Sequence, residues 1–262
     1  MTYPLSATKL ATYKQCPQSY YFKYERGLKS PSSFGSTELG KAVHKTLADI
    51  YSQWSYRDPK PSWEWCLTHW HRNAALLDGN LATEGLSMLS GYYDAYIRPL
   101  TSMAKPLGVE GKLSATLRFD NIEFSLSGRY DRLDWLGDGL ELFDYKTAKT
   151  EAISDATDVQ LGLYCLALEQ VYRRSLKRLT LLYLRSGRSV SFDATPEQQS
   201  EVRSLIADLA LKLRADAEWM PAPGDHCGRC AYRKHCAATT PCPEPLPEDA
   251  RSLRQVQLVL AV

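Results

Sequence analysis

The chain has 262 residues, of which 44% are hydrophobic and 24% charged, and its formal net charge is +2 at pH 7. This composition is that of an ordinary globular protein, and so small a net charge gives no general electrostatic argument for nucleic-acid binding. No apolar run reaches the roughly 18 residues of a membrane span, and the start, MTYPLSATKL, does not resemble a secretion signal, so we expect a cytoplasmic protein without membrane contact.

The N-terminal part of the sequence predicts helices. Ser6 is a suitable N-cap for a short helix, Pro17 interrupts that helix and starts a second one, and Gly27 ends it. Residues 38–54 repeat apolar side chains at helical spacing, and the Trp- and Tyr-rich stretch that follows is also expected to be helical. We therefore treat residues 1–108 as an N-terminal helical part.

From residue 109 the pattern becomes that of strands separated by short turns. The predicted elements are strands at 109–119, 122–135 and 140–147, a helix at 158–172, and strands at 176–185 and 188–194. A last helix runs from Pro196 to about 217, with Thr195 as its N-cap. This order predicts an α+β fold with a core at 109–217. Residues 218–262 are rich in Pro and Cys and form a C-terminal arm, and the three parts together are expected to make one domain.

A carboxylate and an amine interrupt the third predicted strand. Asp144 and Lys146 share one face of it, because side chains alternate along an extended chain. Asp131 would lie nearby if the second and third strands pair as a hairpin. Two carboxylates on neighbouring strands suit Mg²⁺ or Mn²⁺, and a lysine beside them can orient water or stabilise charge on a phosphate. An exposed ion pair between Asp144 and Lys146 explains the same residues equally well.

Four further residues are candidates, and each has a simpler explanation. His44 lies one position off an apolar helical stripe, where a satisfied core residue is more common than a ligand. Glu110 opens the first strand, where an exposed polar role is the usual one. Gln160 and Tyr164 share a helix face and could contact a phosphodiester and stack on a base. Gln160 could equally complete a capping box with Thr157, and Tyr164 could belong to the core.

In combination these residues resemble a known family. The ordered motifs of the RecB-type branch of the PD-(D/E)xK nucleases are similar to four features of this sequence: His44 in GKAVHKTL, Asp131 in GRYDRLD, Asp144-Tyr145-Lys146, and Gln160-x-x-x-Tyr164. The resemblance implies a restriction-endonuclease-like core, in which a central mixed sheet is flanked by helices. It also implies a deoxyribonuclease that depends on Mg²⁺ or Mn²⁺.

The resemblance also implies a role for each residue. His44, Asp131, Asp144 and the main-chain carbonyl of Tyr145 would bind the metal, and Glu110 falls where such nucleases often carry another acid. Lys146 would act in catalysis together with the two aspartates. Gln160 and Tyr164 would contact DNA, and the basic run at 173–188 could guide the DNA backbone.

The cysteines divide into a cluster and single residues. The seven of them are Cys16, Cys66, Cys165, Cys227, Cys230, Cys236 and Cys242. Cys66 and Cys165 fall in predicted helices and are expected to be buried. The C-x₂-C spacing at Cys227 is common in zinc sites, and zinc could use three clustered cysteines with either Cys242 or His235.

The segment SATKLATYKQCPQSYYFKY resembles the N-terminal segment of iron–sulfur members of the family, such as the AddB nuclease domain and the CRISPR-adaptation nucleases. This resemblance implies that Cys16, Cys227, Cys230 and Cys236 hold a [4Fe–4S] cluster. Such a cluster would clamp the C-terminal arm against the N-terminal helices.

The expected function is that of a DNA exonuclease that hydrolyses single strands or DNA ends in repair or end processing. One alternative is a CRISPR-adaptation nuclease that trims spacers together with an integrase partner, and another is a catalytically idle module that binds DNA ends. The sequence contains no G-x-x-x-x-G-K-[ST] motif, so any translocation would need another chain, such as a helicase or a different repair or adaptation protein.

Overall fold

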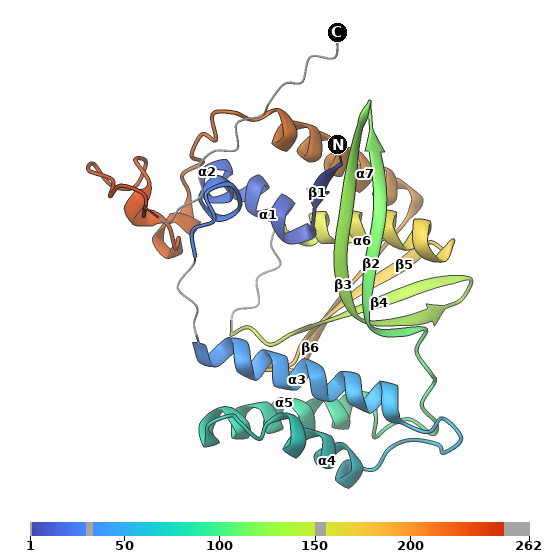
Figure 1. Cartoon of the computed structure of the whole chain (residues 1–262). Coiled ribbons are helices and arrows are strands. Elements are labelled where there is room, and N and C mark those ends of the chain that lie inside the picture. The colour runs from blue at the N-terminus through green and yellow to red at the C-terminus, as the bar shows by residue number, and fades with distance from the viewer. Residues whose placement is uncertain (1, 30–33, 150–155, 249–262) are drawn as a thin grey trace.

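The computed structural model describes residues 2–29, 34–149 and 156–248, and it has a six-stranded mixed sheet at its centre (Figure 1). The strands are β1 (Tyr3–Leu5), β2 (Gly108–Phe119), β3 (Ile122–Leu136), β4 (Gly139–Lys146), β5 (Leu176–Tyr183) and β6 (Arg188–Asp193). Their order is β1-β3-β4-β5-β6, and β2 also pairs with β3. The pairs β1–β3 and β4–β5 are parallel and the others are antiparallel.

Helices cover both faces of this sheet. They are α1 (Ala7–Gln15), α2 (Pro17–Tyr20), α3 (Phe34–Gln53), α4 (Trp63–Asn73), α5 (Gly79–Tyr96), α6 (Ala156–Tyr172) and α7 (Pro196–Ala215). The helices α1, α6 and α7 share one hydrophobic core with the sheet, and α3, α4 and α5 share a second core with it. The expected α+β fold with a central mixed sheet between helices is confirmed.

Alternation along β4 connects the sequence pattern with these two cores. Leu142 packs into the core under α6, whereas Phe143 and Tyr145 face the core of α3 to α5. The predicted hairpin of β3 and β4 is present, with Arg132 opposite Phe143. Side chains of alternate β4 residues therefore reach opposite helical layers, and the charged pair Asp144 and Lys146 lies on the side of α6.

The capping residues that the sequence indicated are found at the helix ends. The hydroxyl of Ser6 accepts a hydrogen bond from the main-chain N–H of Lys9, and Thr195 forms a capping box with Gln198. Gly27 has a φ of 69°, which ends the second N-terminal helical segment. Within the described residues, no helix combines the length and the hydropathy needed to cross a bilayer.

One element of the N-terminal part differs from the expectation of helices alone. Tyr3–Leu5 form a short strand that pairs in parallel with Phe124–Leu126 of β3. Three residues are too few to produce a recognisable alternation, and their partner lies more than a hundred positions away in the chain. The N-terminal part therefore contributes directly to the central sheet.

Candidate active site

Neighbouring strands bring the two candidate aspartates together. The pairing of Arg132 with Phe143 places Asp131 of β3 and Asp144 of β4 one step further along the same hairpin. A carboxylate oxygen of Asp131 accepts a hydrogen bond of 2.6 Å from the main-chain N–H of Tyr145. Asp144 is buried, with 8% of its surface exposed. The sheet thus fixes one carboxylate through the main chain of the adjacent strand.

His44 and Glu110 complete a group around Asp131. The Nδ1 atom of His44, on α3, lies 3.0 Å from a carboxylate oxygen of Asp131. One ligand atom from each of His44, Glu110 and Asp131 lies within 4.8 Å of the others. One imidazole and two carboxylates form a donor set that suits Mg²⁺ or Mn²⁺. These residues therefore fit the divalent metal that the sequence suggested.

The main chain of Glu110 departs from strand geometry. Its φ is +49°, a left-handed value that is uncommon for any residue with a side chain. Regular pairing with β3 is present on both sides of it, at Val109 opposite Arg132 and Gly111 opposite Tyr130. Such conformations cost of order 1–3 kcal/mol and tend to occur at functional sites. The deviation coincides with the point where the Glu110 carboxylate meets His44 and Asp131.

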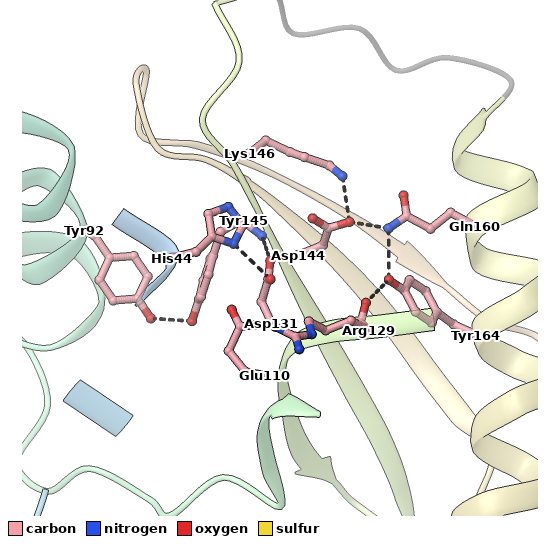
Figure 2. A network of polar contacts seen from close by, with 10 residues as sticks. All are labelled: His44, Tyr92, Glu110, Arg129, Asp131, Asp144, Tyr145, Lys146, Gln160 and Tyr164. Atoms are coloured by element: carbon pink, nitrogen blue, oxygen red, sulfur yellow. Dashed lines mark hydrogen bonds and ion pairs between the residues drawn. The ribbon is translucent and has the colours of Figure 1, made fainter. Parts of the chain in front are cut away.

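Asp144 lies outside this three-residue group and takes part in a second network (Figure 2). One of its carboxylate oxygens accepts a hydrogen bond of 2.7 Å from the amine of Lys146 and another from the side-chain amide of Gln160. Gln160 also contacts the hydroxyl of Tyr164, which donates to the main-chain carbonyl of Arg129 at 2.8 Å. The charges at the end of β4 are therefore held by α6.

The surroundings of Gln160 and Tyr164 bear on the explanations that the sequence offered for them. The helix α6 begins at Ala156, so Thr157 lies inside the helix and not at its N-cap, and the Gln160 amide contacts Asp144. Tyr164 is half-buried against the core, and burial, followed by the charge of Asp144, raises the pKa of its hydroxyl. Tyr164 thus remains a neutral hydrogen-bonding group at physiological pH.

The acidic neighbours of His44 raise its pKa. Burial by itself lowers the pKa of His44, but the hydrogen bond to Asp131 and the charges of Asp131, Asp144 and Glu110 raise it above its ordinary value of 6.5. A proton and a divalent metal ion would compete for the imidazole of His44. The concentration of negative charge that favours the protonated ring is also what attracts a divalent cation.

Arg132 is buried between β3, α3 and α5 next to the site, and nothing in the sequence indicated that this arginine would be buried. It is 6% exposed, and its guanidinium lies 3.9 Å from the ring centre of Phe143 and 4.4 Å from that of Tyr51. It donates a hydrogen bond of 2.7 Å to the hydroxyl of Tyr92. The motif DRLD looks like an exposed charged run, so only the packing of α3 and α5 shows that Arg132 is buried.

Arg129 is a second residue that sequence reasoning missed. Its guanidinium lies 3.1 Å from the carboxylate of Glu110, and its side chain is more than half exposed. It lies two positions before Asp131 on β3, and this closeness in sequence could have identified it as a site residue. Arg129 lines hollows on both sides of the site.

At least half of the six basic residues in the run at 173–188 are engaged in ion pairs. Three of its members pair with acids, as Lys177–Asp138, Arg178–Asp193 and Arg185–Glu84. None of these three lines the two hollows beside the candidate site. These side chains therefore serve mainly to join strands and helices.

Four cysteines come together from the two ends of the chain. Cys16, Cys227, Cys230 and Cys236 line one pocket, whereas Cys242 and His235 do not. The thiol of Cys236 donates a hydrogen bond of 2.8 Å to the Gln18 side chain. Within the described residues, no three of these sulfur atoms lie within 4.8 Å of one another.

The pocket joins two parts of the chain that are far apart in sequence. Cys16, between α1 and α2, is buried, and the other three cysteines of the pocket belong to the C-terminal arm. Cys66 and Cys165 are buried as expected, and burial raises the pKa of each thiol to about 12.

Comparison with known proteins decides the family. The model of the PD-(D/E)XK nuclease superfamily matches residues 4–237. The chain belongs to the PD-(D/E)XK nuclease superfamily. It is similar in structure to the protein described as "Crystal structure of SSO0001", with 11% sequence identity, a TM-score of 0.44, and coverage of 90% of this chain and 87% of that one. No curated protein matches the chain significantly.

Membership of this superfamily confirms the expectation of a nuclease. PD-(D/E)XK nucleases hydrolyse phosphodiesters with divalent metal ions, and the group of His44, Glu110 and Asp131 supplies suitable ligands in this member.

Proposed function

We propose that the protein is a DNA exonuclease that depends on Mg²⁺ or Mn²⁺ and acts on single strands or DNA ends, in repair or end processing. The observation that carries this proposal is the meeting of a three-residue metal-ligand group with a carboxylate–lysine pair on adjacent strands of a PD-(D/E)XK nuclease. The RecB-type motif order supports the narrower choice of an exonuclease. Residues 1–262 would form one nuclease domain in this proposal.

In this proposal His44, Asp131 and Glu110 hold the metal, and Asp144 and the carbonyl of Tyr145 are further ligands. A bound divalent ion lowers the pKa of a coordinated water and neutralises charge on the scissile phosphate. The N–H of Tyr145 keeps the Asp131 carboxylate in place, and Arg129 restrains Glu110 at 3.1 Å. The protein thus fixes the ligands before the substrate arrives.

Lys146 is the proposed catalytic cation. Its amine donates a hydrogen bond of 2.7 Å to Asp144, which orients it at the end of β4. From there it can align the attacking water and stabilise the negative charge that develops on the phosphate. Gln160 and Tyr164 are proposed to face the DNA, because both line the hollow that also contains Lys146.

We also propose that Cys16, Cys227, Cys230 and Cys236 hold a [4Fe–4S] cluster. The four side chains line one pocket, and four thiolates are the ligands that such a cluster takes. The cluster would act as a structural clamp between the α1–α2 junction and the C-terminal arm. Protein partners such as a helicase would supply any translocation.

The test compares linear DNA labelled at its 5′ or 3′ end, incubated with Mg²⁺ or Mn²⁺ and three forms of the protein. We expect the wild type to release the label, and Lys146→Ala to be about 10²–10³-fold slower because a charge-stabilising group is lost. Lys149→Ala is the matched control, since Lys149 is exposed three positions further on and should leave the rate unchanged.

Two results would contradict the proposal. Equal rates for the wild type and Lys146→Ala would show that this site does not perform the cleavage. If the wild type cleaves neither single strands nor duplex ends, the protein is a binding module instead. The order in which the two labels are released gives the polarity of an active enzyme.

A further inference from the structure

One edge of β3 has a gap in its strand pairing. The strand β2 follows β3 from Ile122 to Leu133 and so occupies one edge of it. Both β1 and β4 must then share the opposite edge. There β1 pairs with Phe124–Leu126 and β4 pairs from Arg132 onward. Between them, residues 127–131 have no backbone pairing on this edge with any strand that the structure describes.

The neighbouring elements turn away from this gap. The strand β1 ends at Leu5, and Ser6 immediately caps α1, which leaves the sheet. On the other side β4 runs on to Lys146, but beyond Phe143 it pairs only with β5. The gap is therefore bounded by the start of α1, the end of β4 and the side of α6.

The gap is a hollow because Gly128 offers no side chain on the face of β3 that turns toward α6. Leu126 and Tyr130 point into the core under α6, and Gly128 lies between them on the same face. A Cβ atom built on Gly128 would meet no atom within 4 Å. The resulting hollow has a volume of about 350 Å³ and includes Ala7 and Ala11 on the side of α1.

The lining of the hollow combines apolar walls with polar groups. Leu113, Leu126 and Leu163 provide apolar surface, and Ser127 and Gln160 lie around them. A concave site of a few hundred Å³ with apolar walls and a few polar groups is the usual form of a small-ligand site. This one has the size and character for a single nucleobase with its sugar.

Its position connects it to the candidate active site. Lys146 and Arg129 line this hollow, and Arg129 also lines a second hollow of about 790 Å³ that contains His44 and Asp131. The two hollows therefore share Arg129, and residues of the proposed cleavage site line both of them. A strand whose phosphate lies at His44 and Asp131 would carry its next nucleotide into the gap beside Lys146.

We propose that the gap between β1 and β4 binds one unpaired nucleotide next to the scissile phosphate, and that this subsite selects single-stranded DNA. The inference rests on the proposed function, because it places the reacting phosphate at the His44–Asp131 group. A base within a duplex would have to leave its stack to enter, at a cost of a few kcal/mol, whereas a base in a single strand pays no pairing cost.

The experiment fills the gap and measures DNA binding separately from cleavage. Gly128→Leu fills it from the β3 side, Ala11→Leu fills it from the α1 side, and Ser125→Leu on the exposed face of β3 is the control. The probe is a fluorescein-labelled phosphorothioate oligothymidine, which resists hydrolysis, and binding is read by fluorescence anisotropy in Ca²⁺. Circular dichroism melting checks that each variant folds, and the two filling variants enter from different elements.

We expect both filling variants to bind the oligothymidine about tenfold more weakly than the wild type, which corresponds to the loss of one stacked base. Ser125→Leu should bind as the wild type does. Wild-type affinity in a folded Gly128→Leu or Ala11→Leu protein would overturn the inference. Equal competition by a blunt hairpin duplex against the wild type would overturn it as well.

Cleavage then separates this inference from the proposed function. In Mg²⁺, single-stranded oligonucleotides that each carry one abasic position should show slow hydrolysis by the wild type at a fixed distance from the missing base. Uniform cleavage of the whole series would contradict the subsite. A wild type that binds in the expected way but never cleaves would disprove the nuclease proposal while leaving the binding subsite intact.

Discussion

The two candidate sites of this protein are built in different ways. The group of His44, Glu110 and Asp131 lies on α3, β2 and β3, three long elements with buried faces. The cysteine pocket is formed by the junction of α1 and α2 and by two short 3₁₀ turns, Asp225–Arg229 and Arg233–His235, in which no residue is buried.

Because of this difference, we expect the structure of the cysteine pocket to depend on a bound group more than that of the site on the sheet does. The packing of the sheet and helices holds the carboxylates in place whether or not a metal is bound. Around the cysteines, Tyr232 and Phe22 supply some buried apolar contact, but the turns themselves bury little surface. A bound group that joins distant segments would therefore contribute much of the stability of the arm.

We expect the greatest loss of activity from Asp131→Asn, which disables the site on the sheet and leaves the surrounding structure intact. Asp131→Asn keeps the shape of the side chain and an oxygen that can accept from the Tyr145 N–H, but it removes the charge that a metal needs. We expect the rate of DNA hydrolysis to fall about 10³-fold or more, because several kcal/mol of transition-state stabilisation are lost. Initial rates in Mg²⁺, together with a thermal melt, measure both properties.

Asp138→Asn is the control for this change, because Asp138 is exposed in the turn between β3 and β4. It should hydrolyse DNA at the wild-type rate. An Asp131→Asn protein that retains full activity would show that the carboxylate is not part of the catalytic centre.

A smaller effect concerns the scaffold behind the same site. Arg132→Ala removes a buried guanidinium that contacts Phe143, Tyr51 and Tyr92, and leaves a cavity between β3 and α3. We expect the free energy of unfolding to fall by about 3 kcal/mol. Urea denaturation followed by circular dichroism measures this loss.

The same measurement on Arg129→Ala provides the comparison within β3. The Arg129 side chain is 57% exposed and forms an ion pair of a kind that contributes at most about 1 kcal/mol. If the two arginine variants lose equal stability, the buried cation does not support the sheet in the way proposed.

The smallest effect on cleavage is expected from the cysteine pocket. Cys227→Ser should abolish bound iron and make the C-terminal arm sensitive to limited proteolysis, while DNA hydrolysis stays within about threefold of the wild type, because the sheet site is held independently. Iron content, visible absorbance and proteolysis of anaerobically purified protein test this.

Cys242→Ser is the matched variant, since Cys242 is exposed and lies outside the pocket. It should retain iron and resist proteolysis. Loss of iron in both variants, or in neither, would contradict the four-cysteine assignment, and zinc in place of iron would favour the alternative that the sequence left open.

Much of the fold could be predicted because its signals are local. The turn residues between β2, β3 and β4, the caps at Ser6 and Thr195, and the apolar stripe of α3 each act over a few neighbouring positions. The order of the candidate residues along the chain also resembled a nuclease, and the superfamily match over residues 4–237 supports that interpretation.

Which of the candidate residues contact one another follows from the tertiary structure alone. It placed Glu110, a weak candidate from sequence, with His44 and Asp131, and it joined Asp144 to Lys146 and Gln160 instead. It likewise added β1 to the sheet and left the edge of β3 open beside it. These outcomes depend on contacts between segments far apart in the chain, and the free energy of such contacts comes from packing that no local pattern of residues records.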